Sequence, residues 1–396
     1  ASDVYKRQVP NLRFPEFSGE WEMSSIGEQF ELYSGNTPSR MNKNQFDGSI
    51  NWITSGELKE HYISDTKEKI SEEAAKNNSL KLLPVGTFVI AIYGLEANGV
   101  RGTCSITTRE STISQACMAF TSKMDIQNEF LYSWYKKHGN IIGIKYAQGT
   151  KQQNLSYDII ERFNISYPCM EEQKKLIRFI SLIDQRIATQ NKIIEDLKKL
   201  KSAIIEIEYS PKDSYHSHIG GAIVQISKRN KDNHLCNVLS VSNRQGFIKQ
   251  SEQFEDRNVA SDDTSNYKIV EKNDFAYNPA RINVGSIARL TKFETGIVSP
   301  MYICFRTKDC LLPEYLELFF ESRNFFYHIQ KRLEGSVRLC LSYEELCNIP
   351  IVIPSIEKQK QVDLHLSKLA QKIDLEMKIL QFVQQQKTYL LHQMFI

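Results

Sequence analysis

The chain has 396 residues, of which 24% are charged, and a formal net charge of +3. This length suits two or three domains with separate cores, and the lack of an 18-residue apolar run argues against a membrane-spanning helix. The eight cysteines form no Cys-x-x-Cys pair and have no histidine at zinc-finger spacing. We therefore expect buried, reduced thiols in a cytoplasmic protein.

Short apolar runs broken by Gly, Pro and Asn predict a mixed α/β module between Trp21 and Pro168. Residues 1–8 match nothing in the second half and are left out of this prediction. The expected strands are 51–54, 86–91 and 117–120, and the expected helices are 72–78 and 128–138.

A long helix is predicted over 171–207, because a proline precedes it and Glu171 lies in its first turn. A polar connector at 210–214 leads to a second mixed module. Its expected strands are 236–241, 274–277, 285–290 and 300–305, and its expected helix is 313–332. A second long helix is predicted over 357–394.

The second half of the chain repeats the first. A shift of 186 residues lays 149–209 on 335–395 without a gap. Further upstream the copies align with small gaps, as at Ser114 and Ser299, and then diverge. Each half thus has a divergent N-terminal part, which we call its front, and a repeated C-terminal part. This pattern predicts two related modules that recognise different targets.

Both long helices carry apolar residues at alternating steps of four and three. The positions are 176, 180, 183, 187, 194, 197 and 204 in the first helix, and 362, 366, 369, 373, 380, 383 and 390 in the second. Interruptions at Gln190 and Lys201 recur at Glu376 and Lys387. Each helix thus has a seam, a row of apolar residues along one face, and the two seams match. Matching seams predict that the helices form an antiparallel coiled coil. The alternative is that each helix covers only its own module.

The predicted fold class is therefore α+β. It has two mixed α/β modules separated and held by two long antiparallel coiled-coil helices, in a pseudo-two-fold repeat. The predicted segments are 9–168, 169–209, 210–354 and 355–396.

Catalytic motifs give no support for an enzyme. The sequence has no Walker loop, no Gly-x-Gly-x-x-Gly after a strand and no His-Glu-x-x-His. Asn278-Pro279-Ala280-Arg281 is similar to the Asn-Pro-Pro-aromatic loop of amino-methyltransferases, but the aromatic residue is missing. We therefore expect a binding protein.

Three features together carry a family resemblance: the start at Leu12-Arg13-Phe14-Pro15-Glu16-Phe17, the run Gly48-Ser49-Ile50-Asn51-Trp52-Ile53, and a Pro followed by Glu-x-Gln before each long helix. With them, the chain resembles the specificity subunit of Type I restriction-modification systems. The resemblance implies a non-catalytic subunit whose two target-recognition domains each read half of a bipartite double-stranded DNA target.

The resemblance also implies partners. Two modification subunits would supply S-adenosylmethionine and methylation, and restriction subunits would supply ATP- and Mg-dependent cleavage, so no cofactor is expected in this chain. The helices would serve as spacer and docking surface. The alternative function is a coiled-coil assembly scaffold whose modules bind protein.

Residues between each module and its helix, near the Gly149 and Gly335 turns, are expected close to DNA phosphates. They are Lys145, Gln148, Lys151, Gln152, Arg332 and Arg338. Polar residues on loops beside strands are the candidate base readers, because Arg and Asn suit guanine and adenine edges. They are Asn44, Thr54, Ser55, Tyr93, Arg101, Ser242, Asn243, Arg244, Asn278, Arg281 and Asn283. Turn formation or simple solvation is the alternative for each.

Overall fold

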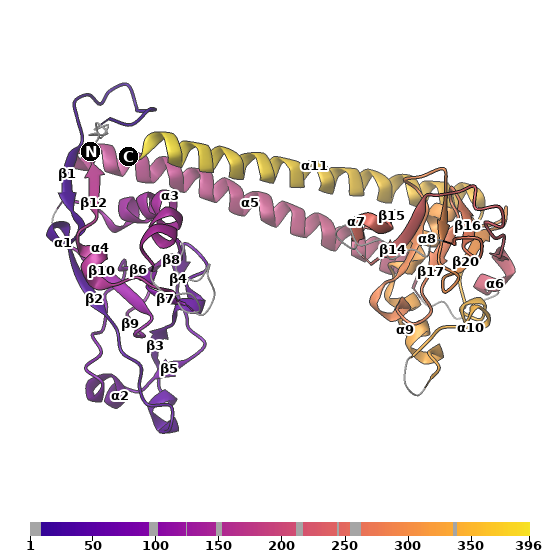
Figure 1. Cartoon of the computed structure of the whole chain (residues 1–396), viewed down its shortest axis with the longest axis horizontal. Coiled ribbons are helices and arrows are strands. Elements are labelled where there is room, and N and C mark those ends of the chain that lie inside the picture. Colours follow the sequence, from indigo (N-terminus) through magenta and orange to yellow (C-terminus); the bar gives the residue numbers. More distant parts are fainter. Residues whose placement is uncertain are drawn as a thin grey trace. The chain divides into compact units, whose positions relative to one another are not determined.

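The structure is a computed structural model that describes residues 9–94, 102–123, 125–147, 153–210, 217–243, 245–253, 263–335 and 339–396. Its contacts divide the chain into two compact units. Unit 1 comprises residues 1–191 with 379–396, and unit 2 comprises residues 192–378. Each unit thus combines one module with part of both long helices (Figure 1). The four segments proposed from the sequence stay a prediction.

Unit 1 contains a five-stranded sheet in the order β2-β10-β6-β8-β4 and a three-stranded sheet in the order β5-β3-β9. Its strands are β1 Glu22–Ser25, β2 Phe30–Ser34, β3 Ile50–Ile53, β4 Tyr62–Ile63, β5 Lys69–Ile70, β6 Phe88–Ala91, β7 Tyr93–Gly94, β8 Cys104–Thr107, β9 Ser111–Ile113, β10 Cys117–Ser122, β11 Gln153–Asn154 and β12 Asn164–Tyr167. Its helices are α1 Ile26–Gln29, η1 Lys43–Phe46, η2 Ser55–Glu57, α2 Glu72–Asn77, α3 Asn128–Tyr146 and α4 Tyr157–Glu161, followed by the start of α5 Met170–Glu208.

Unit 2 contains two four-stranded sheets, in the orders β13-β20-β17-β18 and β15-β14-β19-β16. Its strands are β13 Ile223–Ile226, β14 Val238–Ser242, β15 Gly246–Lys249, β16 Lys268–Glu271, β17 Phe275–Tyr277, β18 Ile287–Arg289, β19 Thr295–Val298 and β20 Ile303–Thr307. Its helices are α6 Ile219–Ala222, α7 Gln250–Gln253, η3 Ile282–Val284, α8 Pro313–Phe320, α9 Arg323–Arg332 and α10 Tyr343–Cys347, followed by the start of α11 Ile356–Met394.

Every predicted strand overlaps an observed one, but the single helix predicted over 313–332 is wrong. It is two helices, α8 and α9, which break at Ser322. The buried Ser322 hydroxyl accepts a hydrogen bond from the Phe325 N–H at 3.2 Å and so caps α9. A serine in this role starts a new helix instead of continuing the old one.

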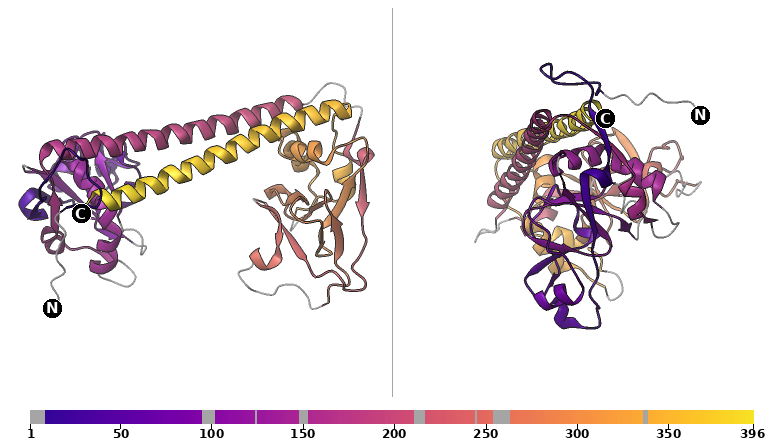
Figure 2. Two further views of the ribbon diagram at one scale, coloured as in Figure 1. Left: turned by 90° about the horizontal axis from the view of Figure 1, so that it is seen from above. Right: turned by 90° about the vertical axis from the view of Figure 1, so that its left-hand side faces the viewer.

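The two long helices run antiparallel within each unit, as predicted. In unit 1, Leu176 and Ile180 of α5 share a core with Leu391 and Met394 at the far end of α11. Figure 2 shows these last turns of α11 against the globular part of unit 1. Each predicted seam position is buried or half-buried.

Unit 2 repeats this arrangement with the helix ends exchanged. Ile205 and Tyr209 at the end of α5 pack in one core with Val362 and Leu366 near the start of α11. Each module therefore packs on the start of its own helix and on the end of the other one.

A buried glutamine joins the module of unit 1 to its helix. Gln173 is fully buried, and its side-chain oxygen accepts a hydrogen bond from the Gln127 N–H at 3.0 Å. Its amide nitrogen donates to the carbonyls of Asp125, at 2.6 Å, and Pro168, at 3.0 Å. One side chain thus links the loop before α3, the turn after β12 and α5.

Unit 2 has the same joint. The fully buried Gln359 accepts from the Leu312 N–H at 2.7 Å and donates to the carbonyls of Cys310 and Pro354, both at 2.9 Å. The sequence repeat therefore extends to equivalent hydrogen bonds.

Substitution of Gln173 by Ala is expected to destabilise unit 1, because it leaves one N–H and two carbonyls, at a partly to fully buried site, without their partner. The expected loss is about 2–4 kcal/mol in the free energy of unfolding. All three tryptophans, Trp21, Trp52 and Trp134, lie in unit 1, so urea unfolding followed by tryptophan fluorescence measures this unit. Gln185→Ala, on an exposed position of α5, is the control. Equal effects of the two substitutions would contradict the joint.

The repeat also reaches the divergent fronts, at a shift of 193. In unit 1, a Cβ on Gly27 of α1 would lie 2.4 Å from the Cγ of Glu161 in α4. In unit 2, a Cβ on Gly220 of α6 would lie 2.6 Å from the Cβ of Cys347 in α10. Glycine thus allows two short helices to touch in both copies.

The expectation of buried cysteines holds only in part. Cys104, Cys117 and Cys304 are buried, and burial raises the pKa of each thiol to about 12. Cys169, Cys236 and Cys310 are exposed, and Cys340 and Cys347 are half-buried. A cysteine in an apolar stretch can still fall at a turn or a strand end, where water reaches it.

A histidine joins module and helices in unit 1. His61 is stacked between the rings of Tyr62 and Tyr132, at centroid distances of 4.1 Å and 3.8 Å. Its Nε2 lies 3.0 Å from a Glu129 carboxylate oxygen, and its Nδ1 lies 3.8 Å from an oxygen of Asp184. Asp184 in turn pairs with Lys387 of α11 at 2.5 Å. Burial lowers the pKa of His61, but its interactions with Asp184 and Glu129 outweigh burial, so the net pKa is raised.

This raised pKa predicts a pH-dependent stability of unit 1. A histidine whose pKa is higher folded than unfolded stabilises fully below about pH 6.5, and this contribution is lost as pH rises through the folded pKa. The free energy of unfolding, measured by tryptophan fluorescence, should therefore fall above pH 6.5. In His61→Gln, which cannot titrate, this part of the decline should disappear. A decline of the same size in the variant would assign it to other groups.

Candidate nucleic-acid interface

Three of the predicted base readers of unit 1, Thr54, Ser55 and Tyr93, lie close to one turn, at 114–117. The N–H of Ser114 donates to the Ile53 carbonyl at 2.9 Å, and the N–H of Ile92 donates to the Ala116 carbonyl at 2.9 Å. Residues 54–55 and Tyr93, which follow Ile53 and Ile92 in the chain, therefore lie beside the turn at 114–117. The sheets place these separate loops at one edge of the module.

Within this edge, Thr54 has a structural role. Its N–H and its hydroxyl both donate to the Glu57 carboxylate, at 2.8 Å and 3.0 Å. The pair forms a capping box around η2, which begins at Ser55. Thr54 and Ser55 thus shape the loop, and whether they also contact DNA stays a prediction.

A hollow of about 520 Å³ opens beside the same turn. Its buried floor is Ile92, Met118 and Leu155. Its rim is polar and mostly exposed, and consists of Ser34, Tyr93, Gln115, Asn154, Ser156 and Tyr157. The pairing of β7 with β11, in which Tyr93 faces Asn154, closes one side. We refer to this hollow as the rim groove.

Two other predicted residues of unit 1, Asn44 and Lys145, lie on elements that make other contacts than the turn at 114–117. Asn44 is exposed in η1, where the neighbouring Gln45 carbonyl accepts from the Ser71 N–H at 3.1 Å. Lys145 is exposed in the last turn of α3, with its Nζ 5.1 Å from the centroid of the Tyr146 ring. Arg101, Gln148, Lys151, Gln152, Arg244, Arg338 and Gly149 lie outside the described residues.

Unit 2 brings five predicted residues together. The Ser286 hydroxyl donates to the Val241 carbonyl at 3.3 Å, and the N–H of Asn278 donates to the Ser286 carbonyl at 3.0 Å. These contacts join the β14–β15 turn to the loop after β17. The residues collected there are Ser242, Asn243, Asn278, Arg281 and Asn283.

Backbone geometry explains the shape of this cluster. Gly285 has φ +86°, and a Cβ placed on it would lie 3.8 Å from the Cβ of Asn243. The Asn278 side chain accepts from the Ala280 N–H at 3.0 Å and so forms the turn. Asn243, Arg281 and Asn283 are exposed, which leaves them the best placed of the five to contact a ligand.

Arg332 is held by its own unit. One guanidinium nitrogen lies 3.0 Å from Nδ1 of His328, another donates to the Asn348 carbonyl at 3.3 Å, and Nε is 3.7 Å from a Glu345 oxygen. These contacts tie α9 to α10. A phosphate would have to share this guanidinium with Glu345. Gly335, the last residue of the described stretch 263–335, has φ +123°.

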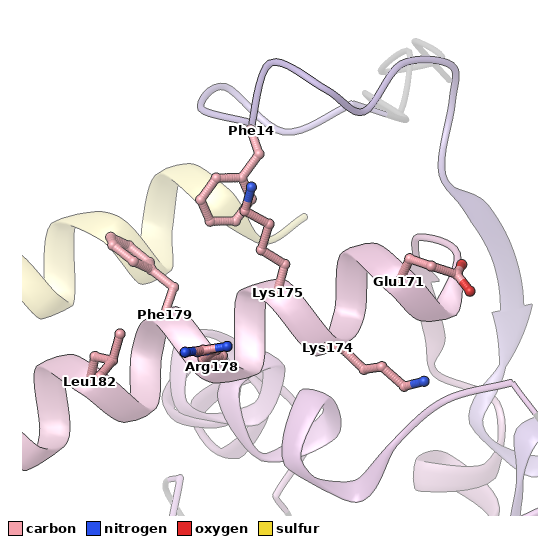
Figure 3. Close-up of a pocket in the computed structure, with 7 residues that line it drawn as sticks. All are labelled: Phe14, Glu171, Lys174, Lys175, Arg178, Phe179 and Leu182. Carbon is pink, nitrogen blue, oxygen red and sulfur yellow. The ribbon is translucent and has the colours of Figure 1, made fainter.

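A second hollow of unit 1, of about 510 Å³, lies along the start of α5 (Figure 3). Phe14 packs edge-on against Phe179 at 5.7 Å, and Lys175 lies over the Phe14 ring and pairs with Glu16. Lys174, Arg178 and Leu182 face the same hollow, and Leu182 is 54% exposed. This surface, which we call the α5 patch, is apolar, and its charged border consists of Glu171, Lys174, Lys175 and Arg178.

The described residues contain no cluster of three or more His, Cys, Asp or Glu side chains that could hold a metal ion. Among the same residues, no helix is long and apolar enough to cross a membrane.

Comparisons with known proteins match part of the chain to one family. A family model described as the Type I restriction modification DNA specificity domain matches residues 18–199. Residues 18–199, somewhat less than half of the chain, thus match a Type I DNA specificity domain. This confirms the resemblance seen in the sequence.

Relatives agree with this domain. The chain is 28% identical over 199 residues to the Type I restriction enzyme MjaIX specificity subunit of Methanocaldococcus jannaschii, covering 48% of this chain and 45% of that protein. It is 27% identical over 201 residues to the EcoR124I/EcoR124II specificity subunit of Escherichia coli, covering 50% and 47%. The matches thus span about half the length of these curated relatives.

The fold extends the likeness beyond the specificity domain. The S subunit of a Type I restriction-modification system from M. genitalium superposes with a TM-score of 0.57 at 15% identity, covering 98% of this chain and 99% of that one. A chain from a structure of the type I R-M system gives 0.59 at 13% identity, covering 94% and 96%. The predicted fold of two mixed modules on two long helices is therefore confirmed.

Proposed function

We propose that this chain is the non-catalytic DNA-reading subunit of a Type I restriction-modification complex, located in the cytoplasm. The observation that carries the proposal is the contrast between the two units. Both use an identical glutamine joint to seat a module on a helix, yet they present different polar loops. An identical frame with different loops suits a protein that reads two unlike half-sites.

Binding to DNA is tested by mobility shift with the full chain, alone and with its modification subunits. Duplex DNA should bind, and log K should fall linearly with log salt as phosphates are neutralised. Absence of salt-dependent binding in both conditions would favour the alternative, an assembly scaffold with protein-binding modules.

In this proposal the chemistry belongs to the partners. Two modification subunits would bring S-adenosylmethionine, and restriction subunits would bring ATP and Mg. The α5 patch is the proposed contact for a modification subunit, since it combines exposed apolar side chains with Lys174 and Arg178. Its partner surface should accordingly be apolar, with acidic groups opposite Lys174 and Arg178.

Leu182→Asp is expected to weaken binding of the modification subunit at least about tenfold, because it buries a carboxylate in an apolar contact. Leu200→Asp is the matched control, since Leu200 is also exposed on α5, at 50%, and lies outside the patch. Both variants are compared by titration calorimetry with purified modification subunit. Equal losses would argue against the patch.

A further inference from the structure

The strands and turns that frame the rim groove have counterparts in unit 2. Strand register pairs Tyr33 with Ala119 in unit 1 and Ile226 with Cys304 in unit 2, so Ser227 stands where Ser34 does. The Leu155-Ser156-Tyr157 run that starts α4 recurs as 341–343 at the start of α10. The scaffold of the groove is therefore part of the repeat.

Three polar positions of the rim are not repeated: Tyr93, Gln115 and Asn154. The N–H of Leu155 donates to the Ile92 carbonyl at 2.8 Å, and the N–H of Leu341 donates to the Pro279 carbonyl at 3.1 Å. This match aligns Ile92 with Pro279, and so aligns Tyr93 with Ala280. The repeat also aligns Asn154 with Cys340.

The same holds at the turn. The N–H of Cys117 donates to the Ser114 carbonyl at 3.0 Å, and the N–H of Tyr302 donates to the Ser299 carbonyl at 3.1 Å. Gln115 and Pro300 follow these serines and occupy the same turn position, which accepts proline. At these two positions, unit 1 thus has the amides of Gln115 and Asn154, and unit 2 has Pro300 and Cys340.

We propose that the rim groove of unit 1 reads an adenine–thymine pair in one half-site, and that the matching surface of unit 2 does not. This inference rests on the proposed function. Gln and Asn amides each suit the N6 and N7 edge of adenine, and an apolar surface suits the thymine methyl group. Gln115 and Asn154 are exposed and line the groove, and the Tyr157 ring, 41% exposed, offers the apolar contact.

The second unit supplies the test substitutions. Gln115→Pro and Asn154→Cys, singly and together, install the residues that unit 2 tolerates on the same frame. The full chain with its modification subunits selects from a randomised duplex pool, and Gln185→Ala on α5 is the control. Tryptophan fluorescence checks that unit 1 is folded, and Gln115→Ala replaces Gln115→Pro if the proline unfolds it.

The expected result is a loss of adenine preference of about tenfold or more at one or two adjacent positions of one half-site. The other half-site should be unchanged. Unaltered preference at every position, or an equal loss on all sequences, would overturn the inference. If the wild-type complex selects no motif, the proposed function itself fails, and that failure is visible without any variant.

Discussion

Exchange of residues 217–350 for those of a relative is expected to change one half of the recognised DNA motif completely and to leave the other half intact. The reason is that the candidate readers of unit 2, Asn243, Arg281 and Asn283, all lie inside this segment. The joint survives because Gln359 bonds only backbone groups of the exchanged part, the Leu312 N–H and the Cys310 carbonyl. Methylome sequencing of cells that express the chimera gives the motif.

The converse exchange of residues 22–167 provides the control. It should change the half-site that the first chimera keeps. A chimera that alters both halves, or neither, would show that the units do not read DNA separately.

A heptad inserted into both long helices is expected to lengthen the gap between half-sites by about three base pairs. Insertions after Asn191 and after Met377 fall at equivalent places of the repeat, between seam positions 187 and 194 and between 373 and 380. Seven residues keep the apolar seam in phase and add about 10.5 Å of helix. At 3.4 Å per base pair this corresponds to about three steps.

Insertion into only one helix is the control. It shifts one seam against the other beyond the insertion and should abolish activity, because buried positions such as Ile194 and Val383 would lose their partners. An active complex with the original gap after the double insertion would mean that the helices do not set the spacing.

The helices could be predicted from the sequence because their signal is local and periodic. The steps of four and three place Leu176, Ile180 and Ile194 on one face, and all three are buried. Even the polar interruptions Gln190 and Glu376 are buried, as positions in a seam should be. The repeat made the two helices comparable, which fixed their antiparallel pairing.

The structure of the fronts was harder to predict from the sequence, because their strands pair with strands that are far away in the chain. β1 pairs with β12 more than 130 residues later, and Glu22 faces Tyr167. In sequence, the equivalence of Gly27 and Gly220 is only a two-residue match. The structure shows it clearly, because each glycine lies against the neighbouring short helix, α4 or α10.

Among the predicted site residues, Thr54 lies in a sequence pattern that indicates a structural role and not a base contact. Thr54-Ser55-Gly56-Glu57 fits a capping box, and the structure contains one. Gln115 and Asn154 carried no such signal, since only the strand register brings a turn at 115 and a strand at 154 to one groove. Asn243 and Arg281, by contrast, were predicted separately and lie in one cluster.

The proposed function is tested most directly by the methylation pattern that this chain directs in its modification subunits. The chain and its modification subunits are expressed in a host without other DNA methylation, and modified bases are mapped across the genome. We expect one motif made of two different specified halves separated by a fixed unspecified gap. A single continuous motif, or methylation without any motif, would contradict it.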